Sequence, residues 1–278
     1  MAKLKRATGT LASYLFVIFM SLIVIAPILI LVIASFKSQK EFIHTSVLTL
    51  PSSWSLSNYF SVADRANLVT ALKNTVIITV SSVIINVILG STFAYALGRF
   101  EFKGRKLIIA MVMGANIIPT VTTQVAIFTI IRSLGLFNKL SAAIVLYAGA
   151  DVVQVLLYQQ AIEAIPRSLD ESVMIDGGSY LQIFLHIILP LLKPTTITVI
   201  ILKIVAIYND MYIPYLYMPS VKLQVVSTSL MTFCSSNYGS QVPMLSAAFI
   251  LVMIPILLIY IFAQRLLFDG ITSGAVKE

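Results

Sequence analysis

The residues best placed to do chemistry lie in one polar stretch, residues 165–194, which reads IPRSLDESVMIDGGSYLQIFLHIILPLLKP. Ser168 followed three residues later by Glu171 predicts a capping box at the start of a helix. Asp170 and Glu171 would then lie in the first turn, where the helix dipole stabilises acids. The chemistry that these residues offer is recognition through a charge fixed at a helix start.

The same stretch also contains a turn. Gly177 and Gly178 predict the end of the first helix, because glycine takes the left-handed conformation without strain. Ser179 and Gln182 repeat the capping-box pattern, so we expect a second helix to start at once and run toward Pro190. The stretch is therefore expected to form an elbow of two helices between apolar segments.

This elbow resembles the EAA signature of ABC-importer membrane subunits. The glutamate, the glycine and the final Ile-x-Leu-Pro match in identity and spacing, whereas small residues stand in place of the two alanines. In that family the elbow is a pair of coupling helices that docks into a cleft on a cytoplasmic ATPase. The alternative, a purely local cap at Glu171, stays open. The resemblance implies ATPase contacts at Glu171, Ser172, Val173, Asp176, Gly177 and Pro190.

Composition favours a polytopic membrane protein. Of 278 residues, 59% are hydrophobic and only 11% are charged, which does not fit a soluble core. The net charge of +8 suits cytoplasmic loops that meet anionic lipid better than it suits nucleic acid. The single cysteine, Cys234, excludes an internal disulfide and a multi-cysteine metal site. The only histidines, His44 and His186, lie far apart, and His186 is expected to be a surface residue.

Six apolar runs are each near the ~20 residues that cross a bilayer. The two termini and two of the loops would lie on one side of the membrane and together carry eleven basic residues. The loops on the other side carry seven, and Lys203 falls within a span. This bias places both termini and the elbow in the cytoplasm. The expected spans are Ala12–Phe36, Asn74–Leu97, Leu107–Ile131, Ala142–Ala161, Thr195–Tyr212 and Leu245–Leu267.

Polar residues inside these spans are candidates for a substrate pathway, because buried polar groups in a membrane usually face a cavity or a partner. Asp151 is expected midway along the fourth span and Lys203 in the fifth. An ion pair between them that fixes helix packing is an equally good interpretation. The predicted pathway residues are Asn116, Thr120, Thr123, Gln124, Asp151, Asn209 and Asp210.

The resemblance extends over most of the chain. Ala94–Phe100 with Gly104-Arg105, Leu134–Leu136 with Asn138, and Tyr208–Asp210 with Pro214 are similar to turns of carbohydrate ABC permeases. Pro51, Trp54, Asn58 and Tyr59 recur in their first outer loop. Together these motifs point to the smaller, six-span subunit of maltose-type importers. The fold implied is all-α, a type I ABC importer transmembrane fold with a cytoplasmic coupling-helix elbow.

In that family, partners supply what this chain lacks. A second permease completes the pathway, an ATPase dimer binds ATP and Mg on the cytoplasmic side, and a solute-binding protein delivers sugar on the outer side. This sequence has no G-x-x-x-x-G-K-[ST] phosphate loop, so we expect a non-catalytic subunit without a cofactor of its own. Two long outer loops, 37–73 and 216–243, are either docking elements or merely solvated. The predicted binding-protein contacts in the second loop are Ser235, Ser236, Asn237, Tyr238 and Gly239.

We expect three regions. These are residues 1–70 with the first span and first outer loop, residues 71–267 with the other five spans, and a cytoplasmic tail at 268–278. The runner-up function is an ion-coupled secondary transporter with Asp151 as the coupling site. Such carriers often show inverted repeats with broken helices, and no repeat is seen here. A membrane-embedded enzyme is a third class, which the lack of catalytic groups argues against.

Overall fold

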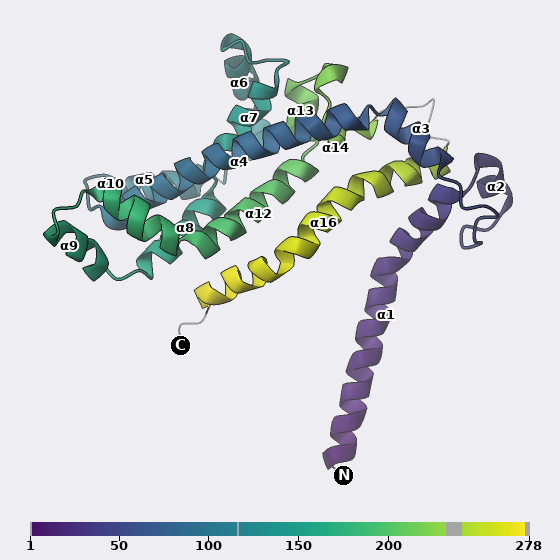
Figure 1. Ribbon diagram of the computed structural model, residues 1–278, viewed down its shortest axis with the longest axis horizontal. Helices are drawn as coiled ribbons and strands as arrows, with labels where there is room; N and C mark the ends of the chain where they lie inside the picture. Colours follow the sequence, from purple (N-terminus) through teal and green to yellow (C-terminus); the bar gives the residue numbers. More distant parts are fainter. Residues whose placement is uncertain (1, 116, 232–240, 276–278) are drawn as a thin grey trace. The chain divides into compact units, whose positions relative to one another are not determined.

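The computed structural model describes residues 2–115, 117–231 and 241–275, and within these ranges the chain forms helices and no strand (Figure 1). The expectation of an all-α polytopic membrane protein is confirmed. The helices are α1 (Ala2–Phe36), α2 (Gln39–His44), α3 (Ser57–Arg65), α4 (Leu68–Arg99), α5 (Arg105–Ala115), α6 (Thr120–Ser133), α7 (Leu140–Ala148), α8 (Val152–Glu163), α9 (Ser168–Ile175), α10 (Tyr180–Ile183), the π-helix η1 (Phe184–Ile188), α11 (Leu189–Leu191), α12 (Lys193–Asn209), α13 (Tyr212–Tyr217), the 3₁₀-helix η2 (Val221–Leu223), α14 (Val226–Ser229) and α16 (Val242–Ala275).

In the part of the chain that the structure describes, three helices are long and apolar enough to cross a membrane unbroken: Ser13–Phe36, Leu68–Arg99 and Val242–Gln264. The span expected at 142–161 is interrupted and consists of α7 and α8, whereas the span expected at 195–212 lies mainly in the single helix α12, which forms a bent pair with the helical segment before it. The pair α7 and α8 bends by 41°, and the pair formed by Tyr180–Leu191 and α12 bends by 73°. Counting each bent pair as one span gives up to five. The third expected span holds α5 and α6, with Pro119 at the start of α6.

The bends have local causes. Between α7 and α8 the backbone is extended at Gly149 and Asp151, so the intrahelical hydrogen bonds are interrupted there. At the bend between α11 and α12, Pro190 lies in α11 and Pro194 in the first turn of α12, and neither proline can donate a backbone hydrogen bond to a continuous helix. Both breaks leave backbone groups that other parts of the protein must satisfy.

The chain divides into two compact units. One comprises residues 1–69 and 229–255. Its small core joins α3 to the start of α16 through Val62, Ala66, Ala247 and Ala248. The end of α1 is fastened to α3, because the Tyr59 hydroxyl lies 2.6 Å from the Ser35 hydroxyl.

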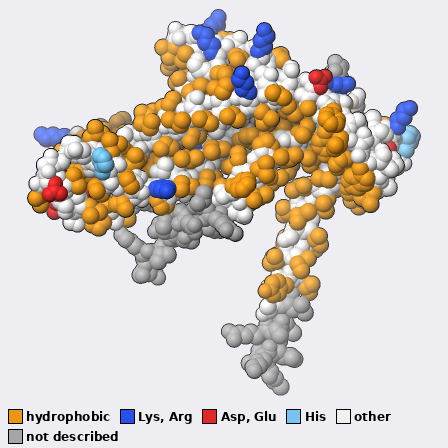
Figure 2. All heavy atoms as spheres, viewed as in Figure 1, with side chains coloured by type: hydrophobic (Ala, Val, Ile, Leu, Met, Phe, Trp, Pro, Cys, Tyr) orange, Lys and Arg blue, Asp and Glu red, His pale blue; other side chains and the backbone are white. Residues whose placement is uncertain are grey.

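The other unit comprises residues 70–228 and 256–278, and α4 runs through it (Figure 1). Near the start of α4, Ile78 packs with α7, α12 and α13 in one apolar cluster. Near its end, Ala94 and Tyr95 pack with α8, α10 and η1 in a second cluster. Hydrophobic side chains cover most of the face in Figure 2, as expected of helices that meet lipid or other membrane helices.

Candidate functional site

The elbow at residues 165–194 starts with α9, but not through the expected capping box. Arg167 is the N-cap, it has helical backbone angles, and no side chain caps the helix. The box at Ser168 and Glu171 was therefore wrong. The reason is Pro166, whose carbonyl already accepts from Leu169 N at 3.3 Å, so the turn begins early. Ser168 then lies inside the helix instead of in the extended conformation that an N-cap needs.

The turn of the elbow is as predicted. Gly177 has φ +81°, the left-handed conformation. Its N–H donates to Met174 O at 3.0 Å, and Gly178 N donates to Val173 O at 2.8 Å. These two bonds form a Schellman motif, which satisfies the last carbonyls of α9. A Cβ on Gly178 would lie 2.9 Å from Val173 O, so this second glycine provides the space for the turn.

The second capping box is also confirmed. Gln182 N donates to the Ser179 hydroxyl at 3.3 Å, and Ser179 N donates to Gln182 Oε1 at 2.7 Å. The helix that follows runs toward Pro190 as expected, and it widens into the π-helical turn η1 before α11. Pro190 lies exposed in α11, beside the bend. The elbow is therefore a rigid turn between two short helical arms.

The elbow presents an exposed surface that mixes charge and apolar atoms. Glu171, Ser172 and Asp176 are exposed, and 85% of Ile175 is accessible. An open groove of about 270 Å³ lies between the arms, lined by Val173, Asp176, Gly178, Gln182 and His186. His186 is exposed as expected, with Nδ1 3.1 Å from Gln182 O. The structure thus brings Val173 and Asp176 together in one groove.

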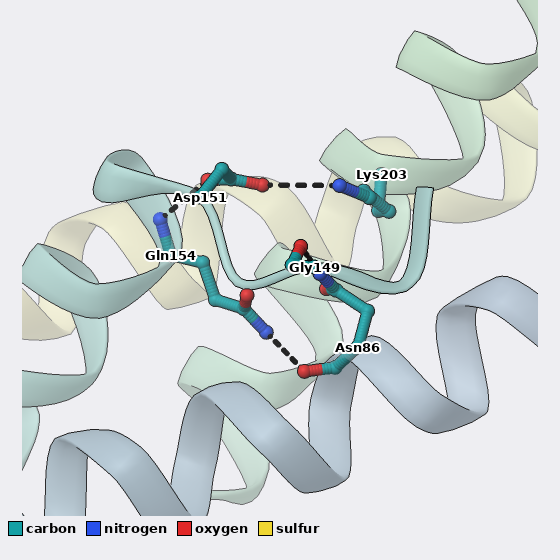
Figure 3. Close-up of polar contacts among 5 residues, drawn as sticks. All are labelled: Asn86, Gly149, Asp151, Gln154 and Lys203. Carbon is teal, nitrogen blue, oxygen red and sulfur yellow. Dashed lines mark hydrogen bonds and ion pairs between the residues drawn. The ribbon is translucent and has the colours of Figure 1, made fainter. Parts of the chain in front are cut away.

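A second polar region lies at the break between α7 and α8 (Figure 3). Asp151 was expected midway along a helix, but it caps the start of α8, with Oδ1 accepting from Gln154 N at 2.9 Å. Its other oxygen lies 3.3 Å from Lys203 Nζ, and 47% of the Asp151 side chain is exposed against 13% for Lys203. The ion pair between the fourth and fifth spans is therefore present.

Two buried amides that sequence reasoning missed complete this region. Asn86 Nδ2 donates to Gly149 O at 2.6 Å, and Gln154 Nε2 donates to Asn86 O at 2.8 Å. The first bond satisfies a carbonyl left free by the break. Gly90 makes room for the Gln154 amide, which a Cβ at that position would overlap. A lone asparagine within an apolar run was the signal that could have identified Asn86.

A pocket of about 290 Å³ opens beside the ion pair. Its polar residues are Asp151, Gln154 and Lys203, and aliphatic residues of α8 and α12 form the rest of the wall. Both polar and apolar groups are therefore within reach of a molecule or side chain that enters it. The aliphatic residues are Val153, Leu157, Val199, Leu202 and Ala206.

The other predicted pathway residues are spread over separate places. Asp210 ends α12 and accepts from the Tyr147 hydroxyl at 2.8 Å and from Tyr212 N at 2.7 Å. Asn209 is exposed and donates to Val205 O at 3.0 Å. Thr123 and Gln124 are partly buried in α6, and Thr120 begins that helix. Asp210 and Asp151 thus belong to different hydrogen-bond networks.

Some predicted residues fall outside the described part of the chain: Asn116 and the five loop residues Ser235, Ser236, Asn237, Tyr238 and Gly239. In the described part, no three His, Cys, Asp or Glu side chains lie close enough to hold a metal ion.

Comparison with known proteins gives consistent matches over nearly the whole chain. The family model described as "Binding-protein-dependent transport system inner membrane component" matches residues 1–273. The probable starch degradation products transport system permease protein AmyC of Thermoanaerobacterium thermosulfurigenes is 38% identical over 264 residues, 94% of each chain. The melibiose/raffinose/stachyose import permease protein MelC of Bacillus subtilis (strain 168) is 32% identical, over 90% of this chain and 91% of MelC.

The fold also matches a solved structure. The crystal structure of a bacterial ABC transporter involved in the import of the acidic polysaccharide alginate aligns with a TM-score of 0.82 and 23% sequence identity. The alignment covers 94% of this chain and 96% of that chain.

Proposed function

The chain belongs to the family of binding-protein-dependent transport system inner membrane components, and from this premise we propose that it is the permease subunit of an ATP-driven importer of oligosaccharides or related sugars. The resemblance inferred from the elbow is confirmed by this membership. AmyC and MelC, whose names refer to starch degradation products and to melibiose, raffinose and stachyose, support the sugar class.

The elbow is the observation that carries the coupling role. Its turn is fixed by the Schellman motif at Gly177, and its exposed face offers Glu171, Asp176 and an accessible isoleucine. A rigid, exposed element of mixed chemistry suits docking to another protein better than it suits contact with lipid. We assign the ATPase contact to Glu171, Ser172, Val173, Asp176, Gly177 and Pro190.

The partners follow from the same role. A second permease would complete the pathway, an ATPase dimer that itself binds ATP and Mg would dock at the elbow, and an extracytoplasmic binding protein would deliver the sugar. The subunit itself is not an enzyme on this proposal. It lies in the cell membrane with both termini and the elbow in the cytoplasm, as the excess of basic residues on that side supports.

The pathway is proposed to include the polar residues predicted from the sequence, with Asp151 and Lys203 forming part of its wall beside the pocket of about 290 Å³. The loop at 235–239 is proposed to contact the binding protein. Sugar hydroxyls need hydrogen-bond partners in place of water as they move, and such residues provide them. The remaining members of the set are Asn116, Thr120, Thr123, Gln124, Asn209 and Asp210.

The ion-coupled alternative is weaker. A coupling carboxylate must gain and lose a proton or ion in each cycle, whereas Asp151 caps α8 and is paired with Lys203. Family membership also favours ATP-driven import.

Purification from native membranes tests the proposal. A second, different permease and an ATPase with a phosphate loop should copurify with this chain in fixed ratio. A preparation that contains only copies of this chain and still transports sugar would contradict the proposal.

A further inference from the structure

The elbow is fastened to the last turn of α4 by polar contacts that docking alone does not require. Arg99 is the final residue of α4, and its Nε lies 3.0 Å from Asp170 Oδ2 in the first turn of α9. Its Nη2 donates to Ile165 O at 2.9 Å, just before α9. Only 6% of the Arg99 side chain and 17% of the Asp170 side chain are exposed. One guanidinium therefore holds the start of α9 at two points.

The second arm of the elbow is attached to the same turn. The Tyr95 hydroxyl, one helical turn before Arg99, donates to Tyr180 O at 3.2 Å. The Tyr95 ring lies 5.0 Å from the Phe184 ring, and the Phe100 ring lies 4.9 Å from the Tyr180 ring, measured between centroids. Both arms are thus fixed to one helix end. If the elbow moved without the end of α4, the largely buried ion pair between Arg99 and Asp170 would have to break.

The same helix makes two further polar attachments along its length. Asn86 joins α4 to the break in the fourth span by donating to Gly149 O at 2.6 Å (Figure 3). Asn74 Nδ2 donates to Lys222 O at 3.0 Å and Gln224 O at 2.9 Å, in the segment that follows the fifth span. At 1.5 Å per residue, Asn86 lies about 20 Å and Asn74 about 37 Å from Arg99 along the helix axis.

We propose that α4 transmits the motion of the elbow through the membrane as one rigid element, with Arg99 as the positioning residue at its input and Asn86 and Asn74 at its outputs. This inference rests on the proposed function, since it needs an ATPase that moves the elbow. A helix with fixed intrahelical bonds resists compression, and its three attachments are the points where it can displace other segments. Motion at the elbow would thereby open the break in the fourth span and shift the outer segment.

The test uses the full complex in vesicles, with a mixture of maltodextrin and raffinose as the probe. The measured quantity is sugar-stimulated ATP hydrolysis divided by basal hydrolysis. We expect Arg99→Gln to lower this ratio by about tenfold, a common size for coupling between sites, while the complex still assembles. Lys103→Gln removes the same charge from an exposed site in the turn that follows α4 and should change nothing. Tyr95→Phe deletes only the hydroxyl and should lower the ratio less, and it serves as the test variant if Arg99→Gln fails to assemble.

A double variant separates transmission from simple structural damage. Asn74→Ala should also lower the stimulation ratio, although it lies far from the docking surface. Because both residues act through one helix, the Arg99→Gln/Asn74→Ala pair should lose no more than the worse single variant. Losses that multiply, or wild-type stimulation in both Arg99→Gln and Tyr95→Phe, would overturn the inference. A wild-type complex without any sugar-stimulated hydrolysis would instead contradict the proposed function.

Discussion

Replacing Gly177 by valine should uncouple the transporter without unfolding it. Gly177 holds φ +81°, and a Cβ at this position would meet nothing within 4 Å, so the substitution adds backbone strain and no collision. A β-branched residue in the left-handed region costs on the order of 1–3 kcal/mol. The rest of the elbow is fixed by the capping box at Ser179 and by the contacts to α4. The strain should therefore be relieved by opening the turn, which rotates one arm away from the other.

The consequence can be estimated from the same energy. If the elbow docks only in its closed form, a penalty of about 1–3 kcal/mol lowers the docked fraction, or the apparent affinity for the ATPase, by about 5-fold to 150-fold. Sugar-stimulated ATP hydrolysis, titrated with ATPase in vesicles, would measure this shift. Gly177→Asn should behave almost as wild type, because asparagine tolerates the left-handed conformation.

The chain offers a matched control for strain alone. Gly135 has φ +67°, and a Cβ there would likewise meet no atom within 4 Å, but this glycine lies in the turn after α6 and not in the elbow. Gly135→Val should carry a similar backbone penalty and leave the apparent ATPase affinity unchanged. Equal affinity losses in both valine variants, or none in Gly177→Val, would refute the idea that the shape of the elbow governs docking.

Three further outcomes are expected. Glu171→Gln should lower sugar-stimulated ATP hydrolysis as much as Glu171→Ala does. Glu171 forms no capping box, so the charge is the property of this side chain that can contribute to docking. Wild-type stimulation in the glutamine variant would show that the charge is dispensable. Ser172→Cys, in a Cys234-free background, should react with a thiol reagent only when the cytoplasmic side is accessible; labelling by an impermeant reagent in intact cells would reverse the topology. Lys203→Met should lower the unfolding free energy of the complex by about 1–3 kcal/mol, which lies between the contributions of exposed and of buried ion pairs. Adding Asp151→Asn should restore most of this loss, since asparagine still caps α8. A thermal unfolding series in which the double variant is the least stable would contradict this prediction.

Local signals predicted the elbow well. The turn at Gly177 and the box at Ser179 and Gln182 depend on residues only a few positions apart, so the sequence contains all the information that they need. The failure at Ser168 was also local: Pro166 starts the helical turn earlier than the serine pattern suggests. Where two local signals compete, the residue with the more restricted backbone decides the helix start.

The contacts that join the elements could not be predicted in this way. Arg99 and Asp170 meet because α4 and α9 pack together, and neither residue has a neighbour in sequence that indicates the other. Asn86 and Gln154 likewise meet across two helices. The same limit applies to hydropathy, which located the fourth span but not its break: Gly149 and Asp151 end one helix and start another inside an otherwise apolar run.

The central claim, ATP-driven import, is tested most directly by the energy source of uptake. Vesicles should contain this chain with its copurifying partners, and the maltodextrin and raffinose probe should be supplied outside with the binding protein. We predict uptake that requires ATP inside the vesicles, persists after ion gradients are collapsed, and stops when the binding protein is omitted. Uptake that proceeds without ATP and follows an imposed proton or sodium gradient would contradict the assignment and favour coupling at Asp151.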